Sequence, residues 1–361
     1  MKQKNNHYIL CGGGTGGHIY PAIAIAEELL TYPETSVHFV GALGKMEMEK
    51  VPKAGYTITG MPIRGLQRGK ILENVKLPFQ LASSLVKSYR LLKKQKPKAI
   101  IGTGGYASAP IAIVASFLKI PVFLQEQNSF PGLVNRKISK YAKCVFTAYP
   151  NMERFFPGTK VIETGNPLRQ SLINQLKTNT QNSKSSNKTV LILGGSLGAR
   201  SINTFFKNHI PNMIHQENTN WIWQCGKLYL QDCKSELSKH NSNTIELHDF
   251  IYNMSEVYNQ ADIVICRAGA LTVSEIALLN KPTIFIPSPN VTDNHQYKNA
   301  KVLADELACE LIEEKDLDHQ FDSIISLLND TEKLNNLKEH LKPFSKPKAS
   351  QSIVNQIHSV L

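Results

Sequence analysis

Two segments of the chain share one pattern, in which a short apolar run enters a glycine-rich turn and then a probable helix. They are ILCGGGTGGH at 9–18 and LILGGSLGAR at 191–200. A turn without side chains lets the backbone approach a polar ligand at a helix N-terminus. The repeat predicts two Rossmann-like domains in tandem, with a cleft between them lined by the carboxyl ends of both sheets.

Short β-branched runs alternate with longer helical patterns along the whole chain. They are apolar throughout rather than alternating, which is typical of parallel strands that are covered on both faces. The sequence therefore predicts an α/β fold with two parallel sheets. The candidate strands are 8–11, 37–40, 100–102, 122–124, 144–147 and 161–164 in the first series, and 190–193, 221–224, 244–247, 263–266 and 283–286 in the second.

The predicted domain boundary falls within 165–188, because its second half (KTNTQNSKSSNK) has no large apolar residue and is typical of a linker or loop. We expect an N-terminal domain at 1–164 and a C-terminal domain at 165–345. The last segment, 346–361, has apolar residues at helical spacing. It predicts a C-terminal helix that could pack back on the N-terminal domain.

A membrane-spanning segment is not expected. The apolar stretch 99–124 carries one charge, Lys119, but its glycines and prolines suit a strand, a turn, a short buried helix and another strand. The apolar run at 8–11 is far too short for a signal peptide.

The sequence also lacks the signs of a metal site or a disulfide framework. Its six cysteines include no CxxC and no His/Cys ligand spacing, so we expect reduced, buried thiols. The DxD triplet at 316–318 lies in a charged stretch that is typical of a solvated surface.

The net charge of +12 is confined to the first half of the chain. Residues 1–165 hold 22 Lys+Arg against 9 Glu, which gives +13, and residues 166–361 hold 19 against 20, which gives −1. Only the first half is therefore a candidate for contact with an anionic partner. No segment resembles a nucleic-acid module and interleaved aromatic residues are sparse, so nucleic acid is not expected.

The segment 64–98 concentrates this charge, with ten basic residues against Glu73 alone. Apolar residues lie between them, so the segment predicts contact with an anionic membrane surface. The alternative is an ordinary amphipathic helix whose apolar face is core. The basic residues are Arg64, Arg68, Lys70, Lys76, Lys87, Arg90, Lys93, Lys94, Lys96 and Lys98, and the apolar ones are Leu72, Val75, Leu77, Phe79, Leu81 and Leu85.

The first glycine turn, Gly12–Gly17, satisfies GxGxxG, but a dinucleotide site should also offer a carboxylate near the end of the second strand. That strand ends Val40-Gly41-Ala42, so the pattern argues against an NAD enzyme.

Two further glycine-containing segments favour a nucleotide diphosphate. Gly194–Gly198 places the Ser196 hydroxyl beside backbone amides, although it could be simply a tight turn. The segment 267–275 predicts another helix start, where Glu275 could serve either the helix dipole or ribose hydroxyls. Packing alone does not require three helices that begin at glycine-containing turns. Binding of one nucleotide diphosphate explains all three.

Seven segments together resemble the MurG family of N-acetylglucosaminyltransferases, which complete the lipid-linked disaccharide of bacterial peptidoglycan. They occur in family order and span nearly the whole chain: GGGTGGHIYPAIAIA (12–26), GTGGYASAP (102–110), EQNSFPGLVNR (126–136), TGNPLR (164–169), LGGSLGAR (193–200), RAGALTVSE (267–275) and DNHQYKNA (293–300).

The resemblance implies a GT-B fold and an inverting transfer from UDP-N-acetylglucosamine that needs no metal and no cofactor. The implied acceptor is undecaprenyl-pyrophosphoryl-N-acetylmuramyl-pentapeptide (lipid I), and the product is lipid II. Such an enzyme works at the cytoplasmic face of the cell membrane as a peripheral protein. The alternatives are a UDP-N-acetylglucosamine epimerase and another UDP-sugar lipid glycosyltransferase.

The resemblance also assigns binding residues, with the donor nucleotide mainly on the C-terminal domain. Arg169 and Ile251 lie around the nucleotide, and the backbone of Ile251 is near the uracil. The residues for the diphosphate and ribose are Ser196, Ala270, Leu271, Thr272, Val273, Ser274 and Glu275, with Glu275 on the ribose hydroxyls. The residues around the sugar are Gln296, Asn128, Thr15, Gly16 and Gly17.

His18 is the first candidate for the catalytic base or for orienting the acceptor. It follows the first glycine turn at a helix start, where the helix dipole disfavours the imidazolium; it could instead pack the turn. Glu126 is the second candidate. The family usually has His where this chain has Gln125, which cannot act as a base near neutral pH, so a role for this position in proton transfer is not expected.

Overall fold

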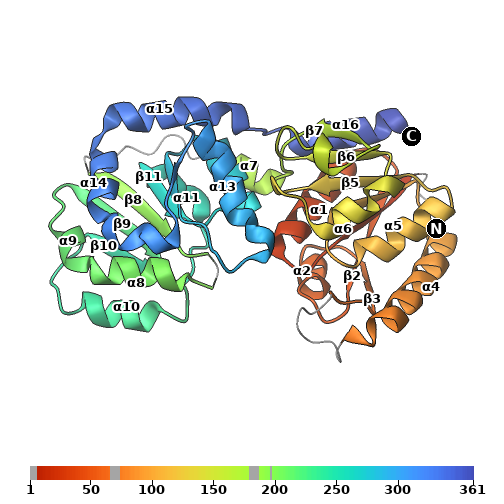
Figure 1. The fold of residues 1–361 in the computed structure, drawn as a ribbon, viewed down its shortest axis with the longest axis horizontal. Coiled ribbons are helices and arrows are strands. Elements are labelled where there is room, and N and C mark those ends of the chain that lie inside the picture. Colours follow the sequence, from red (N-terminus) through yellow and green to blue (C-terminus); the bar gives the residue numbers. More distant parts are fainter. Residues whose placement is uncertain (1–5, 66–73, 179–186, 196) are drawn as a thin grey trace. The chain divides into compact units, whose positions relative to one another are not determined.

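The computed structural model describes residues 6–65, 74–178, 187–195 and 197–361. The chain divides into two compact units, each built on one parallel sheet (Figure 1). Unit 1 comprises Met1–Gln170 together with Lys346–Leu361, and unit 2 comprises Ser171–Ser345.

The sheet of unit 1 has seven strands in the order β3-β2-β1-β4-β5-β6-β7, and every neighbouring pair is parallel. All six strands predicted for this half are present. The sequence did not predict β3, because its residues, Ile-Thr-Gly-Met, do not form a continuous apolar run. The strands are β1 (Asn6–Gly12), β2 (Thr35–Ala42), β3 (Ile58–Met61), β4 (Ala99–Gly104), β5 (Val122–Glu126), β6 (Cys144–Thr147) and β7 (Lys160–Glu163).

The helices of unit 1 cover this sheet, and the C-terminal helix is one of them. In α16, Ile353, Val354 and Ile357 are fully buried in the same hydrophobic cluster as the inner face of α1. Burying such side chains stabilises the unit by roughly 1.5–3 kcal/mol each. The helices are α1 (Gly16–Leu29), α2 (Glu47–Lys53), α4 (Leu77–Gln95), α5 (Ser108–Phe117), α6 (Leu133–Ile138) and α16 (Ala349–Val360).

The apolar stretch 99–124 forms β4, the short buried helix α5 and the beginning of β5, which confirms the predicted arrangement. Among the described residues, no helix has both the length and the apolar composition needed to cross a bilayer.

The sheet of unit 2 has six parallel strands in the order β10-β9-β8-β11-β12-β13. All five predicted strands are present, and the missed strand, β13, is a two-residue edge strand. The strands are β8 (Lys188–Leu193), β9 (Thr219–Gln224), β10 (Ile245–His248), β11 (Ile263–Cys266), β12 (Thr283–Phe285) and β13 (Glu310–Leu311). The helices in and around this unit are α7 (Gln170–Thr178), α8 (Arg200–Asn208), α9 (Ile210–Ile214), α10 (Leu230–Leu237), α11 (Met254–Gln260), α12 (Ala270–Leu279), α13 (His295–Asp305), α14 (Phe321–Asn329) and α15 (Thr331–Leu341).

The core of unit 2 is built around two fully buried tryptophans of β9, Trp221 and Trp223. Each indole N–H has an acceptor, as buried tryptophans require. Trp221 donates to the Met213 carbonyl at 3.2 Å, and Trp223 donates to Oδ1 of Asn203 at 3.1 Å.

The loop predicted at 177–188 is shorter in the structure. Lys177 and Thr178 end α7, and Lys188 begins β8. Residues 179–186 lie outside the described part of the chain.

The strand orders indicate where ligand sites are expected. The order reverses between β1 and β4 in unit 1 and between β8 and β11 in unit 2. In doubly wound sheets, ligands bind beyond the carboxyl ends of the strands at such a switch point. The first glycine turn follows β1, Gly194–Gly198 follows β8 and 267–275 follows β11, so all three predicted segments lie at switch points.

Candidate active site

At the switch point of unit 1, the turn after β1 packs directly on the turn after β4. Gly105 has φ +86°, and a Cβ there would lie 2.5 Å from the Gly13 carbonyl oxygen. Gly104, at φ +106°, faces the imidazole of His18, and a Cβ there would lie only 2.9 Å from Nε2. These two glycines are needed both for their left-handed backbone and for the close approach.

Part of the first glycine turn is occupied from within the unit. The Gly13 N–H donates to the Gly104 carbonyl at 3.3 Å, and the Gly14 N–H donates to Oε2 of Glu47 at 2.9 Å. Glu47 is fully buried, and its other oxygen accepts from the Ala42 N–H at 2.9 Å. The start of this turn is therefore neutralised by a carboxylate and is not an open phosphate cradle.

That Glu47, from α2, would support this turn was not predicted from the sequence. The N–H groups of Gly16 and Gly17, unlike those of Gly13 and Gly14, lie in the first turn of α1, where the helix itself supplies no acceptor.

His18 is the third residue of α1 and is half-buried. Its Nδ1 lies 2.8 Å from the Gly13 carbonyl oxygen. A carbonyl can only accept, so Nδ1 carries the hydrogen and the neutral ring has its lone pair on Nε2. The His18 backbone carbonyl is in turn bonded by the Thr103 hydroxyl at 2.7 Å.

Glu126 ends β5 and is buried, and its carboxylate accepts four N–H groups. Oε1 accepts from the backbone and side chain of Asn128, at 3.1 and 3.3 Å. Oε2 accepts from the Gly132 N–H at 3.2 Å and from the Asn135 side chain at 2.9 Å. This arrangement holds the loop after β5 and orients Asn128.

Gln125 is fully buried in a network of amides. Its Nε2 donates to Oδ1 of Asn166 at 3.0 Å, and its Oε1 accepts from the Gln127 side chain, which also donates to the Thr103 carbonyl at 2.7 Å. The Asn166 side chain donates to the Gln127 carbonyl at 3.1 Å. Gln125 therefore joins β5 to the segment after β7.

Arg169 is exposed in unit 1, and its guanidinium lies over the Tyr20 ring, 4.9 Å from the ring centroid. Thr15 is the N-cap residue of α1 and is exposed as well.

In unit 2, the predicted residues follow four different strands of one sheet, β8, β10, β11 and β12. Gly195 and Gly198, both at φ +81°, form the turn after β8, whereas Ser196 lies outside the described residues. Ile251 lies in the loop after β10 with its side chain buried.

The helix α12 begins at Ala270, and its N-cap, Gly269, has no side chain with which to cap the first turn. A helix N-terminus of this kind is a favourable position for an anion. Glu275 is the sixth residue of α12, beyond the first turn in which the helix dipole acts strongly, so the dipole explains it poorly.

Two other residues of the predicted segment cannot offer their side chains. Val273 is buried in the core, and the Ser274 hydroxyl donates back to the Ala270 carbonyl at 3.1 Å. Residues Leu271 and Thr272 are half-buried.

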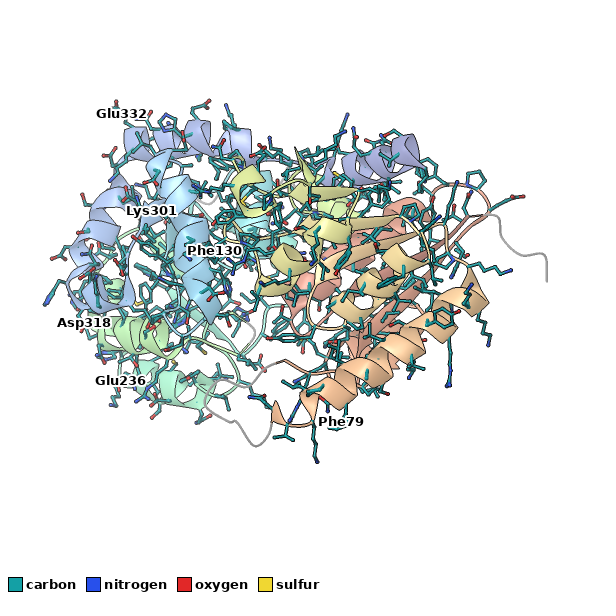
Figure 2. The ribbon with its side chains drawn as sticks, turned by 45° about the vertical axis from the view of Figure 1, so that its right-hand side comes forward. Phe79, Phe130, Glu236, Lys301, Asp318 and Glu332 are labelled. Carbon is teal, nitrogen blue, oxygen red and sulfur yellow. The ribbon has the colours of Figure 1, made fainter. Side chains whose placement is uncertain are left out.

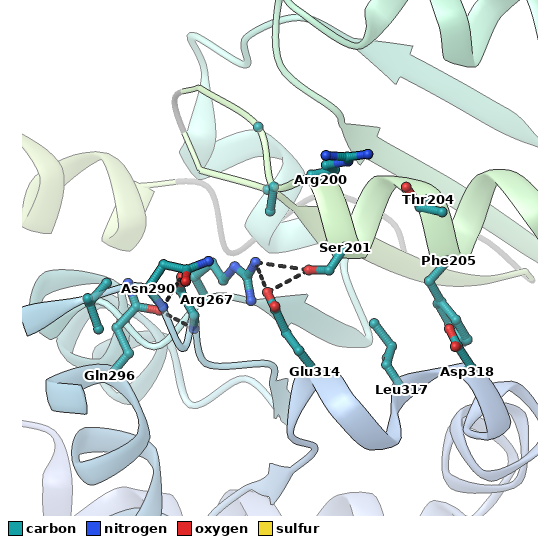
Figure 3. A pocket seen from close by; sticks show the side chains of 15 residues that line it. Arg200, Ser201, Thr204, Phe205, Arg267, Asn290, Gln296, Glu314, Leu317 and Asp318 are labelled. Atoms are coloured by element: carbon teal, nitrogen blue, oxygen red, sulfur yellow. Dashed lines mark hydrogen bonds and ion pairs between the residues drawn. The ribbon is translucent and has the colours of Figure 1, made fainter.

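A pocket of about 620 Å³ opens beside this region, between α8, the start of α13 and the 3-10 helix η4 (Glu314–His319) (Figure 3). Gln296 lines it and accepts from the Ser288 N–H at 2.9 Å. Arg267 also lines the pocket, where it pairs with Glu314 and donates to the Ser201 hydroxyl at 3.0 Å (Figure 3).

The DxD triplet lies in η4, with Leu317 buried and Asp318 at the pocket. Within the part of the chain that the structure describes, no cluster of three His, Cys, Asp or Glu residues could hold a metal ion.

Comparison with known proteins identifies the family. The N-terminal domain of glycosyltransferase family 28 matches residues 8–147, and the C-terminal domain of that family matches residues 189–358. The UDP-N-acetylglucosamine--N-acetylmuramyl-(pentapeptide) pyrophosphoryl-undecaprenol N-acetylglucosamine transferase of Flavobacterium psychrophilum is 49% identical over 97% of this chain and 96% of its own length. The transferase of the same name from Cytophaga hutchinsonii is 38% identical over 100% and 98%. The chain belongs to the MurG family of glycosyltransferases.

Solved structures agree with this membership. The crystal structure of Acinetobacter baumannii MurG superposes with a TM-score of 0.81 at 30% identity, over 98% of this chain and 99% of that one. The predicted GT-B class, with two parallel α/β sheets, is confirmed.

A UDP-GlcNAc 2-epimerase from Neisseria meningitidis also superposes, with a TM-score of 0.69 over 98% of this chain and 100% of that one. At 14% identity, this likeness shows the shared fold alone. The MurG-family relatives, not the epimerase, therefore indicate the chemistry of this chain.

Proposed function

We propose that this chain transfers N-acetylglucosamine from UDP-N-acetylglucosamine to lipid I, with inversion, and so forms lipid II in peptidoglycan synthesis. The observation that carries the proposal is the 49% identity, over nearly the full length of both chains, to a transferase named for that reaction. The site residues below are our assignments within that function.

We assign the donor nucleotide to unit 2, at the switch point between β8 and β11. The start of α12 and the glycine turn after β8, with Ser196, would hold the diphosphate. Ile251 would meet the uracil, Glu275 the ribose hydroxyls and Gln296 the sugar. Because Val273 and Ser274 have their side chains engaged, they would contribute through the backbone only.

In the chemical step, the acceptor hydroxyl attacks the anomeric carbon of N-acetylglucosamine while the bond from that carbon to the UDP oxygen breaks. The hydroxyl proton passes to the base, and UDP leaves with the electron pair. We assign the base to Nε2 of His18, because the Gly13 carbonyl holds the ring in the tautomer whose lone pair is on that atom. Glu126 is less suited, since four donors already occupy its carboxylate.

The departing UDP would be stabilised by backbone amides, by helix N-termini and by a cation such as Arg169. Asn128, which Glu126 orients, would contact the sugar. Thr15, Gly16 and Gly17 belong to the first turn of α1 and would close over it.

We assign the acceptor and the membrane to unit 1, through α4. The side chains that α4 buries include Ser84 and Ser88, both small and polar, so its apolar side chains are not all used for packing. Phe79 is 77% exposed and Val86 is 51% exposed, and Figure 2 shows Phe79 projecting from α4. An apolar face that is core would be buried instead.

Exposed basic residues also lie on α4 and next to its two ends. Lys76, Lys93, Lys94 and Lys96 are exposed, whereas Lys87 donates to the Gly60 carbonyl at 2.7 Å. Apolar and basic groups together suit the surface of an anionic bilayer. The predicted residues Arg68, Lys70, Leu72 and Glu73 lie outside the described part of the chain. We therefore propose peripheral attachment to the cytoplasmic face of the cell membrane.

The experiment that tests the function measures UDP release from UDP-N-acetylglucosamine in the presence of EDTA, with and without lipid I. We expect release that depends on the acceptor. A donor that is bound without acceptor-dependent release would point to an epimerase, and transfer of another UDP-sugar at an equal rate would point to a different lipid glycosyltransferase.

A further inference from the structure

Gln224 is the last residue of β9, between β8 and β10 at the carboxyl edge of the sheet in unit 2. Its side chain is 5% exposed, and both ends of its amide are used. Nε2 donates to the Gly195 carbonyl at 3.0 Å, and Oε1 accepts from the Ile251 N–H at 2.8 Å. Gly195 belongs to the turn after β8 and Ile251 to the loop after β10, so one side chain joins the loops on both sides of its strand.

The turn after β8 also rests on the backbone around Gln224. The Gly194 N–H donates to the Gln224 carbonyl at 3.1 Å. A Cβ at Gly226 would lie 2.5 Å from the Gly198 nitrogen, so these two segments pack backbone against backbone. The last backbone hydrogen bond between β9 and β10 runs from the Cys225 N–H to the His248 carbonyl. The Gln224 side chain binds the chain three residues after His248, at Ile251.

We infer that Gln224 is a positioning residue for the donor nucleotide, and that it holds the diphosphate turn and the base-binding loop at a fixed separation. The inference rests on the proposed function, which places the diphosphate at Gly194–Gly198 and the uracil at Ile251. A primary amide suits this position because it donates at one end and accepts at the other. The carboxylate of a glutamate keeps only the acceptor. The thioether of a methionine, a side chain of similar length, has no donor and is a weak acceptor.

The hydrogen bond from the Ile251 N–H to Gln224 also affects which nucleobase the loop can bind. Gln224 already takes the Ile251 N–H, so the backbone of that residue has its carbonyl oxygen to offer. A carbonyl oxygen accepts from the N3–H of uracil, whereas N3 of cytosine is itself an acceptor and would face it with no hydrogen between them. Gln224 therefore favours uracil over cytosine by keeping the Ile251 N–H engaged.

The test compares Gln224→Met and Gln224→Glu with the unmodified full chain. Calorimetry gives the Kd of UDP and of CDP, and steady-state assays give the KM of each substrate. We expect Gln224→Met to weaken UDP binding by about ten-fold, the size of effect that follows when a buried donor loses its acceptor. Its preference for UDP over CDP should narrow, and the KM of lipid I should stay unchanged. Gln224→Glu should keep the preference for UDP, because its carboxylate still accepts from Ile251, while UDP binding weakens.

Asn203→Ala is the matched control. Asn203 is another buried amide with both ends used, since it donates to the Cys225 carbonyl at 2.8 Å and accepts from Trp223 at 3.1 Å. We expect it to lower the Tm while the preference for UDP over CDP stays that of the unmodified chain.

Each outcome has one meaning. If the unmodified chain fails to bind UDP, the proposed function is wrong. If that chain binds UDP and Gln224→Met binds it as tightly with the same base preference, only the role of Gln224 is overturned. A narrowed preference in Asn203→Ala equal to that in Gln224→Met would overturn it too, because the effect would then be general destabilisation. Should Gln224→Met fail to fold, an unchanged UDP affinity in Gln224→Glu is the overturning result.

Discussion

Nδ1 of His18 lies 2.8 Å from the carbonyl oxygen of Gly13, and this contact decides which nitrogen of the ring can take a proton. The carbonyl can only accept, so the hydrogen is on Nδ1 and the lone pair of the neutral ring is on Nε2. Gly104 supports the arrangement, because any side chain there would meet the ring.

We expect His18→Gln to lower kcat by roughly 10²–10⁴-fold, the usual contribution of a positioned general base. The Kd of UDP should stay the same, since His18 lies in unit 1 and the nucleotide is assigned to unit 2. Steady-state kinetics and UDP titration check both. His215→Gln is the control, because His215 is an exposed histidine of unit 2. Near-normal turnover in His18→Gln would exclude the assignment.

Glu126→Gln should act on stability rather than on proton transfer. The substituted amide would place an NH₂ group against N–H donors that now meet a carboxylate oxygen, and we expect a loss of about 1–3 kcal/mol in the free energy of unfolding. The pH–rate profile of the folded fraction should keep its shape. Urea denaturation and the pH–rate profile test this. The control is Glu163→Gln, at an exposed residue that loses its ion pair with Lys346. Disappearance of the acidic limb of the profile would instead make Glu126 the base.

Phe79→Asp should weaken binding to vesicles that contain anionic phospholipid by about ten-fold or more, because it removes an aromatic side chain from the apolar face and adds a negative charge. Sedimentation with vesicles measures the change. Leu307→Asp makes the same kind of substitution at an exposed residue of unit 2, whose φ of +55° aspartate tolerates, and it should bind as the unmodified chain does. Equal loss in both variants, or binding that ignores salt and lipid charge, would contradict the assignment of α4.

The six cysteines should resist thiol reagents in the folded protein at pH 8. All six are buried, and burial raises the pKa of the Cys11 thiol to about 12 and that of Cys144 to about 11. A hydrogen bond with Cys233 lowers the pKa of the Cys225 thiol, so this residue is protected by its burial alone. Since the thiolate is the reactive form, about one Cys11 thiol in 10⁴ would be ionised at that pH. Absorbance after addition of a chromogenic disulfide should show no fast labelling, whereas six thiols react in guanidinium chloride. Stoichiometric labelling of the folded chain within minutes would show that the buried sites open.

Most of the fold was predictable because central parallel strands are buried on both faces and so require continuous apolar runs. Runs such as Ile9–Cys11 and Ile263–Cys266 reveal such strands without any tertiary information. The edge strands β3 and β13 lack this signal, because their sequences, Ile-Thr-Gly-Met and Glu-Leu, contain no continuous apolar run. The edge strands β7 and β10 were predicted, so edge position alone does not hide a strand. The glycine turns were predictable as well, since Gly12–Gly17 and Gly194–Gly198 follow strands directly.

The hydrogen-bond partners of the site residues could not be predicted from the sequence. Sequence could suggest His18 and Glu126 as alternative bases, but it could not show that Gly13 orients one of them while four donors occupy the other. Nor could it show that Glu47 occupies part of the first glycine turn, because an acidic residue at the start of a helix usually serves only the dipole.

The sequence by itself determined the family, the order of the strands along the chain and the presence of glycine at each strand end, because these depend on residue type and local spacing. Only the tertiary structure decided which atoms meet, such as Gln224 with Gly195 and Ile251. These contacts join residues that are 27 to 29 positions apart, and strand order and register, not local spacing, bring them within hydrogen-bonding distance.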